Sequence, residues 1–235
     1  VPSVPIHGHP LGVDIGLDSY LATSDGELVK RPRFFNRLSG QLKLLQRRLK
    51  NKRKGSKNWL KQISKIARLH QKIHDTRKDW HYQLAHRLCD TAGMIFVEDI
   101  NFKAWAKGMF SKHTLDAGFG QFFNILADVC WKRDVFFLKV DKDYTSQICP
   151  NCHTHVGKKS LNERIHSCSC GYTTNRDTAA SQVIRNRGLV AVQRGLGGFP
   201  HERLHQDAVG QPVNQNACGE VLSGFDSKIR LDKTR

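Results

Sequence analysis

The sequence predicts an α/β fold: a mixed sheet with helices packed on it, an inserted long helical hairpin and a small cysteine-rich module. Three observations predict this fold. Short apolar runs bounded by turn residues, which are typical of strands, occur on both sides of a long segment with helical spacing of leucine and isoleucine. Two close pairs of cysteines then separate the last predicted strand from the last predicted helix.

The segment 11–30 is predicted to form a meander of three strands. Its first two apolar runs contain Leu11 and Tyr20, and a Ser24-Asp25-Gly26 turn precedes the third. Asp-Gly between two apolar runs favours a hairpin. Later segments are predicted to add two buried strands, over 93–98 and 135–140, and two helices, over 118–133 and 177–187, with a linker around Gly108.

The segment 36–92 is predicted to form two long antiparallel helices. The first helix has an apolar seam of Leu38, Leu42, Leu45 and Leu49, and Lys54-Gly55-Ser56 interrupts the pattern. The seam expected for the second helix consists of Leu60, Ile63, Ile66, Leu69, Ile73, Trp80, Leu84 and Leu88. Such seams predict that the two helices pack against each other and leave polar outer faces.

The net charge of +17 lies almost entirely in this hairpin. Residues 30–78 contain 18 Lys and Arg against one acid, Asp75, while the rest of the chain is balanced. A localised basic stripe is the electrostatic footprint of a polyanion partner. The alternative is a solvated helical face, but such faces usually alternate charges of both signs. The basic residues expected to contact nucleic acid are Arg47, Arg48, Lys52, Arg53, Lys54 and Lys57.

Composition argues against a membrane protein and against a secreted one. The sequence lacks the run of about 18 apolar residues that a membrane helix needs, and its N-terminus lacks the pattern of a signal peptide. Seven cysteines are an odd number, and four of them form two close pairs. This usage fits a reducing compartment and a bound metal better than a disulfide framework, so we expect a cytoplasmic protein.

Three acidic residues lie where predicted strands or helices begin or end: Asp14, Glu98 and Asp177. A buried carboxylate is costly unless it is paired or bound to a cation. Each residue also has an ordinary alternative, as a strand-end residue or, for Asp177, as a helix N-cap. Together at one sheet edge they would hold two Mg²⁺ or Mn²⁺ ions for in-line phosphodiester hydrolysis. The strand pleat favours Glu98 over its neighbour Asp99.

The four paired cysteines predict a zinc site. Cys149-Pro-Asn-Cys152 is a standard zinc knuckle, and Cys168-Ser-Cys170 is its expected partner. Four thiolates around Zn²⁺ form a closed, structural site. The second pair has one intervening residue instead of two, so either this short turn closes or His153 or His166 replaces one thiolate. Two further cysteines in helical segments, Cys89 and Cys130, are expected to be buried small hydrophobic side chains.

In combination, these motifs resemble the TnpB family of RNA-guided nucleases, which bacterial transposons encode and which are related to type V CRISPR effectors. The resemblance runs from about residue 11 to residue 187, and the basic stretch 52–57 fits it. The matching motifs are Gly12-Val-Asp14-Ile-Gly16-Leu, Val97-Glu98-Asp-Ile-Asn101, Cys149-Pro-Asn-Cys152 and Cys170-Gly-Tyr-Thr-Thr-Asn-Arg-Asp177-Thr-Ala-Ala180.

The resemblance implies an RNase H-like (RuvC) nuclease domain that is split in sequence, with a zinc ribbon before its third acidic motif. By position, Asp14, Glu98 and Asp177 match the metal-binding carboxylates, the four paired cysteines match the ribbon, and Arg176 is expected to contact the scissile phosphate. The implied order is nuclease at 11–35, hairpin at 36–92, nuclease at 93–145, zinc ribbon at 146–172, nuclease at 173–190 and a weakly ordered tail at 191–235.

The implied activity is RNA-guided DNA cleavage in the bacterial cytoplasm, with Mg²⁺ (or Mn²⁺) and Zn²⁺ as cofactors and guide RNA and target DNA as partners. Members of the family usually carry a long region before the first acidic motif, and here about ten residues precede Gly12. We therefore expect the nuclease half of such a protein, with a second chain as one source of the remainder. The alternatives are a truncated nucleic-acid-binding protein that does not cleave, and a transposase accessory protein.

Overall fold

The computed structural model describes residues 6–108, 111–160 and 162–194, and within these ranges five strands form a mixed sheet in the order β3-β2-β1-β4-β5. The strands are β1 (Pro10–Ile15), β2 (Ser19–Thr23), β3 (Leu28–Lys30), β4 (Met94–Glu98) and β5 (Phe136–Val140). The first three form the predicted antiparallel meander, while β1, β4 and β5 run parallel. The predicted mixed sheet is therefore confirmed.

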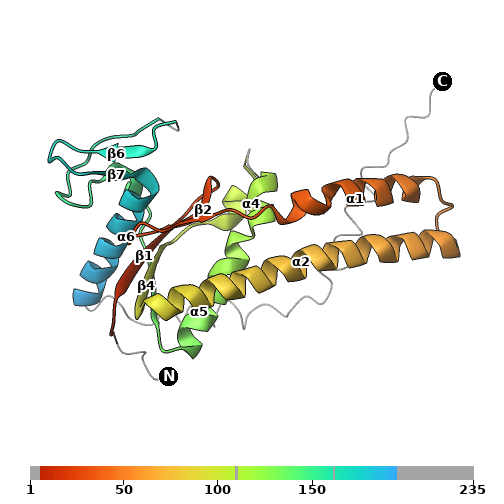
Figure 1. Ribbon diagram of the computed structural model, residues 1–235, viewed down its shortest axis with the longest axis horizontal. Helices are drawn as coiled ribbons and strands as arrows, with labels where there is room; N and C mark the ends of the chain where they lie inside the picture. Colours follow the sequence, from red (N-terminus) through yellow and green to blue (C-terminus); the bar gives the residue numbers. More distant parts are fainter. Residues whose placement is uncertain (1–5, 109–110, 161, 195–235) are drawn as a thin grey trace. The chain divides into compact units, whose positions relative to one another are not determined.

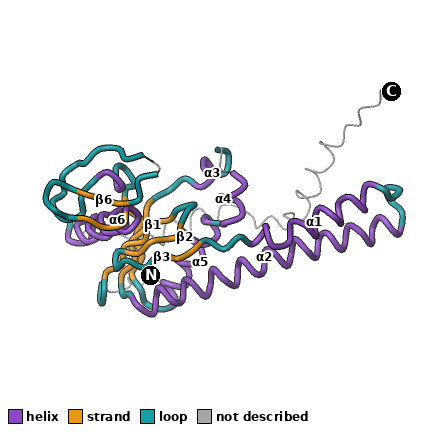
Figure 2. The backbone as a smooth tube through the Cα atoms, turned by 45° about the horizontal axis from the view of Figure 1, so that its top comes forward, coloured by secondary structure: helices purple, strands orange, loops and turns teal. Residues whose placement is uncertain are grey.

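The predicted helical hairpin consists of α1 (Phe34–Lys50) and α2 (Lys57–Thr91), which lie side by side in Figure 2. Buried Leu42 of α1 packs with Ile66 and Leu69 of α2, as the apolar spacing predicts. The Ser56 side chain caps α2 by accepting a hydrogen bond from the Trp59 N–H at 3.2 Å. The break at Lys54-Gly55-Ser56 is thereby confirmed.

The predicted seam of α2 is wrong at Leu60, which is 52% exposed. The buried positions of this helix continue from Ile66 back to Gln62, and the Gln62 amide donates to the carbonyl oxygen of Leu45 at 2.9 Å. Because successive residues of a helix are turned by about 100° from one another, a seam through Gln62 points Leu60 away from α1. A polar side chain with a backbone partner therefore occupies the place expected for leucine.

The second half of α2 packs against α5 (Phe119–Lys132), the helix predicted over 118–133. Cys89 of α2 and Cys130 of α5 are both buried there, with their sulfurs 3.6 Å apart, which confirms them as small buried groups. Two short helices occupy the predicted linker: α3 (Phe102–Trp105) and α4 (Ser111–Ala117). The Asn101 side chain caps α3 by accepting a hydrogen bond from the Ala104 N–H.

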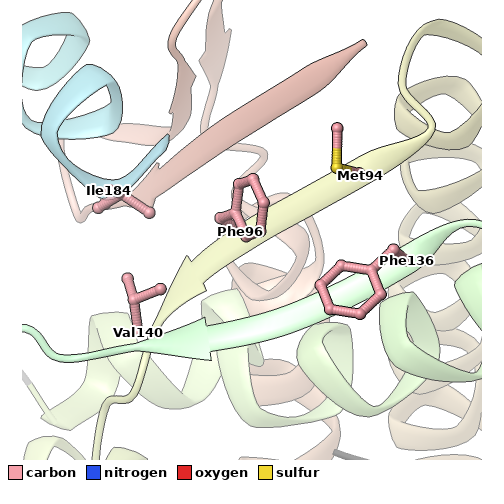
Figure 3. Close-up of a cluster of buried hydrophobic side chains, with 5 residues drawn as sticks. All are labelled: Met94, Phe96, Phe136, Val140 and Ile184. Atoms are coloured by element: carbon pink, nitrogen blue, oxygen red, sulfur yellow. The ribbon is translucent and has the colours of Figure 1, made fainter. Parts of the chain in front are cut away.

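Helix α6 (Arg176–Gln193) covers one face of the sheet, with α5 and the end of α2 on the other (Figure 1). A Cβ atom at Gly12 of β1 would lie 1.9 Å from the Ser181 carbonyl oxygen, so the helix backbone lies directly on this strand. Gly188 of α6 likewise permits a close approach, because a Cβ atom there would lie 2.2 Å from the Phe96 ring. Further along, Ile184 packs into an apolar cluster with Met94, Phe96, Phe136 and Val140 (Figure 3).

The C-terminal elements differ from the expected boundaries in two respects. Helix α6 continues to Gln193, so residues 191–193 are helical rather than part of a tail; residues 195–235 of the predicted tail lie outside the described residues. Strand β7 (Thr173–Asn175) pairs with β6 (Ile165–Ser167), so the cysteine module extends past its predicted end at 172. Within the described ranges, no helix is long and apolar enough to cross a membrane.

We expect Gly12→Ala to lower the free energy of unfolding by about 1–3 kcal/mol, because the added methyl group meets the backbone of α6 and forces the helix from the strand. Thermal unfolding followed by circular dichroism measures this change. The matched control is Gly40→Ala in α1, where a new Cβ meets nothing within 4 Å. That variant is expected to be unchanged or more stable. Equal midpoints for the two variants would contradict the prediction.

Candidate functional site

Asp14, Glu98 and Asp177 line one cavity of about 420 Å³. Strand geometry accounts for the first two. Gly12 and Phe96 are register partners on β1 and β4, and both face α6. Because side chains alternate along a strand, the residues two positions further, Asp14 and Glu98, lie on the same face. The structure therefore brings together the three acidic residues that the sequence selects.

Asp177 faces the cavity from the first turn of α6 because its neighbour Asn175 caps the helix. The Asn175 side chain accepts a hydrogen bond from the Asp177 N–H at 2.9 Å. The alternative interpretation of Asp177 as the N-cap is therefore wrong. On β4, Glu98 is buried whereas Asp99 is exposed, as the pleat predicts.

Bringing the three carboxylates into one cavity disfavours their charged forms, because they are removed from water and repel one another. Burial raises the pKa of Asp14 well above its usual value, and the charges of Glu98 and Asp177 raise it further. Burial also raises the pKa of Glu98, against the opposing effect of a hydrogen bond from Thr145. A bound cation would remove much of this penalty, because it would offset both the desolvation and the repulsion of the carboxylates.

Thr145 is a cavity residue that the sequence does not single out. It begins the short 3₁₀ helix η1 (Thr145–Gln147), and its hydroxyl donates a hydrogen bond to Oε1 of Glu98. The preceding residue, Tyr144, has a φ of 60°, a conformation that is uncommon for a residue with a side chain. This backbone turn directs Thr145 toward the carboxylate, and no motif in the sequence marks it.

Basic side chains line the same cavity. The Nε atom of Arg176 lies 3.8 Å from Oδ1 of Asp177. The Arg176 side chain also donates a hydrogen bond to the Ser160 carbonyl oxygen at 3.0 Å. Lys158 and Lys159, which no sequence motif marks, also line the cavity. Arg176 therefore lines the cavity that holds the three carboxylates, and its contact with a phosphate stays a prediction.

The four paired cysteines come together as a candidate metal site. Their sulfurs all lie within 4.8 Å of one another. Among the described His, Cys, Asp and Glu residues, these four form the cluster whose ligand atoms are all this close, so they could share one metal ion. The sulfurs of Cys152 and Cys168 lie 3.5 Å apart, and those of Cys149 and Cys170 lie 3.8 Å apart. Neither His153 nor His166 belongs to this group, which favours four thiolates over the alternative in which a histidine replaces one of them.

The short second pair closes because a residue with positive φ follows it. Gly171 has a φ of 84°, and its N–H donates to the Cys168 carbonyl oxygen at 3.0 Å. His153, with a φ of 61°, makes the equivalent hydrogen bond to Cys149 at 2.9 Å. The two turns are thus alike despite their different spacing. Contact with Thr154 lowers the pKa of Cys152 to about 6, which favours the thiolate that binds metal.

The basic residues selected for nucleic-acid contacts gather at the tip of the hairpin, apart from the residues that line the acidic cavity. We call this group the hairpin tip. Arg47 and Arg48 lie in the last turn of α1, and Lys57 begins α2. The connecting segment between the two helices carries the other three, Lys52, Arg53 and Lys54.

Comparison with known proteins identifies the family. A family model described as "Probable transposase" matches residues 2–108, and one described as "Cas12f1-like, TNB domain" matches residues 119–184. A Streptomyces pristinaespiralis protein named "Putative RNA-guided DNA endonuclease" is 31% identical over 214 residues, 89% of this chain and 53% of the relative. A "TnpB-like protein L79" of Acanthamoeba polyphaga mimivirus is 27% identical over 134 residues, 53% of this chain and 25% of the relative. The chain belongs to the TnpB family.

One further curated relative and one solved structure are also similar to this TnpB-family chain. A protein of Escherichia coli strain K12, "Putative RNA-guided DNA endonuclease InsQ", is 29% identical over 82% of the chain and 53% of the relative. The chain thus spans about half the length of these curated relatives. A cryo-EM structure of a Cas12f1–sgRNA–target DNA complex is similar in fold, with a TM-score of 0.56 at 18% identity, over 80% of this chain and 51% of that one.

We expect this TnpB-family chain to hold one zinc ion at its four cysteines. Cys170→Ser should lower zinc content and stability, because a hydroxyl is a poorer zinc ligand than a thiolate. Elemental analysis of the purified protein and a chelator titration with a chromogenic zinc indicator measure the change. Ser169→Ala, at the exposed position between the two cysteines, is the control and should keep its zinc. Equal zinc content in both variants would contradict this assignment.

Proposed function

We propose that the chain supplies the nuclease part of an RNA-guided DNA endonuclease of a bacterial transposon, with phosphodiester hydrolysis at Asp14, Glu98 and Asp177. The observation that carries the proposal is the convergence of three carboxylates from β1, β4 and α6 in one cavity. Two relatives whose names describe RNA-guided DNA endonucleases support it. The strand order β3-β2-β1-β4-β5 with α6 on one face supports the assignment of an RNase H-like (RuvC) domain.

The carboxylates fit Mg²⁺ or Mn²⁺ as cofactors. Hard divalent cations prefer oxygen ligands. The pKa of Asp14 is raised first by burial and then by the charges of Glu98 and Asp177, and a cation would offset both effects. When bound, such ions supply Lewis acidity that activates water and stabilises the departing 3′ oxygen. The chain itself would hold Glu98 in place through Thr145 and bind the substrate phosphate through Arg176.

The remaining parts are proposed to serve binding and structure. The hairpin tip would contact the phosphates of guide RNA or target DNA, because its basic side chains have few acidic neighbours in the sequence. The cysteine module would be a zinc ribbon with a closed, structural site. Its Lys158 and Lys159 line the acidic cavity, so the ribbon also contributes to substrate binding.

We expect Asp14→Asn and Glu98→Gln to reduce cleavage of single-stranded DNA in Mg²⁺ or Mn²⁺ at least about 100-fold, the scale on which removal of one electrostatic partner of a reacting group acts. Gel assays, with and without RNA co-purified from the expression host, measure the rates. Affinity for nucleic acid should stay nearly unchanged. Asp99→Asn is the matched control, because Asp99 follows Glu98 in sequence but is exposed.

Cleavage by Asp14→Asn at the rate of the unaltered chain would contradict the assignment of the carboxylates. Loss of cleavage after removal of RNA would support a guide. Tight binding of nucleic acid without any cleavage by the unaltered chain would favour the alternative function, a nucleic-acid-binding protein that does not cleave.

We expect the double variant Arg47→Glu/Arg48→Glu to weaken nucleic-acid binding. For duplex DNA, log K falls as log salt rises, and each lost phosphate contact should make this negative slope shallower by about 0.9. Fluorescence anisotropy across a salt series measures affinity and slope together. Lys132→Glu/Lys139→Glu, on α5 and β5, changes the net charge equally and is the control. Equal affinities for the two double variants would show that the hairpin tip is only a solvated face.

A further inference from the structure

Trp105 lines the cavity that holds the three carboxylates. It is the last residue of α3, and its side chain is 37% exposed. The other apolar side chains at its wall, Ile15, Ala22 and Ala180, are aliphatic and smaller. A large aromatic ring among the charged groups is not accounted for by metal or phosphate binding. The polar roles proposed for the cavity leave this indole without a function.

The indole is held in place by two phenylalanine rings. Phe102 lies nearly perpendicular to it, at 88°, with ring centroids 6.2 Å apart. Phe119, which is almost fully buried, lies at 85° with a centroid separation of 6.1 Å. Edge-to-face contacts of this kind are favourable and fix a ring without covering it completely. Trp105 is therefore an anchored aromatic ring that remains partly open at the cavity.

An open aromatic ring beside cationic side chains is the combination by which proteins bind single-stranded nucleic acid. Bases stack on the ring regardless of sequence, while the basic groups contact the backbone. Here Lys158, Lys159 and Arg176 line the same cavity as the indole. In a duplex the bases are already stacked on each other, so a ring at this position favours unpaired nucleotides.

We propose that Trp105 stacks on a base of single-stranded DNA and thereby positions the neighbouring phosphodiester at Asp14, Glu98 and Asp177. The proposal rests on the function proposed for this cavity, and it specifies the substrate: an unpaired strand, held with little sequence preference. Trp105 is on this account a substrate-positioning residue, because it takes part in no bond change.

The test measures binding without cleavage, in the full chain carrying Asp14→Asn. The ligands are an oligodeoxyadenylate of about 12 nucleotides, within the usual site size, and an abasic oligomer of equal length. Anisotropy is recorded at a salt concentration that screens the phosphate contacts of the hairpin tip. We expect Trp105→Ala to weaken binding of the oligodeoxyadenylate about 5- to 100-fold and to leave the abasic oligomer unaffected.

Two further variants separate stacking from folding. Trp105→Phe should keep most of the affinity, because it retains an aromatic face. Trp131→Ala, at another exposed tryptophan, should change the binding of neither oligomer. An equal loss on both oligomers in Trp105→Ala, or no loss on either, would overturn the proposal.

The outcome is distinguishable from failure of the proposed nuclease function. A base-dependent loss of affinity in Trp105→Ala, combined with absence of cleavage by the unaltered chain, would leave a cavity that binds single strands without cutting them. Cleavage by the unaltered chain, combined with no base-dependent loss, would keep the nuclease and remove the stacking role.

Discussion

The direct contact between α6 and β1 at Gly12 is the constraint on which the acidic cavity depends. With no side chain at this position, the Ser181 carbonyl lies against the strand and the helix is held at the closest approach a backbone allows. The strand is fixed in turn by Ser24, whose N–H and hydroxyl both hydrogen-bond to the backbone of Gly12. As a result, the first turn of α6 lies beside Asp14, and Asp177, which is distant from Asp14 in the sequence, lines the same cavity.

The same contact joins the cysteine module to the cavity, since both are fixed to α6. The Tyr172 hydroxyl donates to Gln182 at 2.6 Å, and Asn186 donates to the Pro150 carbonyl oxygen at 3.1 Å. Lys159 is held in turn by the Ile165 carbonyl oxygen at 3.3 Å. A metal at the cysteines would thus stabilise the loop that carries the basic wall of the cavity, although it would take no part in the chemistry there.

Local patterns in the sequence predict the elements and mark two of the acidic residues, whereas the meeting of all three carboxylates is implied only by the family resemblance. Apolar runs define the strands, and a carboxylate interrupting or ending such a run, at Asp14 and Glu98, is conspicuous. Features set by tertiary contacts are missed. Thr145 is placed by the unusual backbone of Tyr144, and Trp105 by phenylalanines from two helices. The prediction for Leu60 is wrong because Gln62 takes the buried position and its side-chain amide donates a hydrogen bond to Leu45 of α1. The spacing of apolar residues cannot show such a contact.

The hairpin is supported unevenly along α2, whose 35 residues extend over about 52 Å. Its C-terminal half lies against α5, whereas near the tip it packs against α1 through Leu42, Ile66 and Leu69. Near the tip, a single apolar seam holds the two helices together against the repulsion of many positive charges. The free energy of local opening should therefore be low there, so amide hydrogens should exchange faster than those of the sheet. A bound polyanion would suppress that opening by neutralising the charges. Part of the free energy of such binding would therefore be spent on ordering the hairpin tip, and this entropic cost increases with temperature.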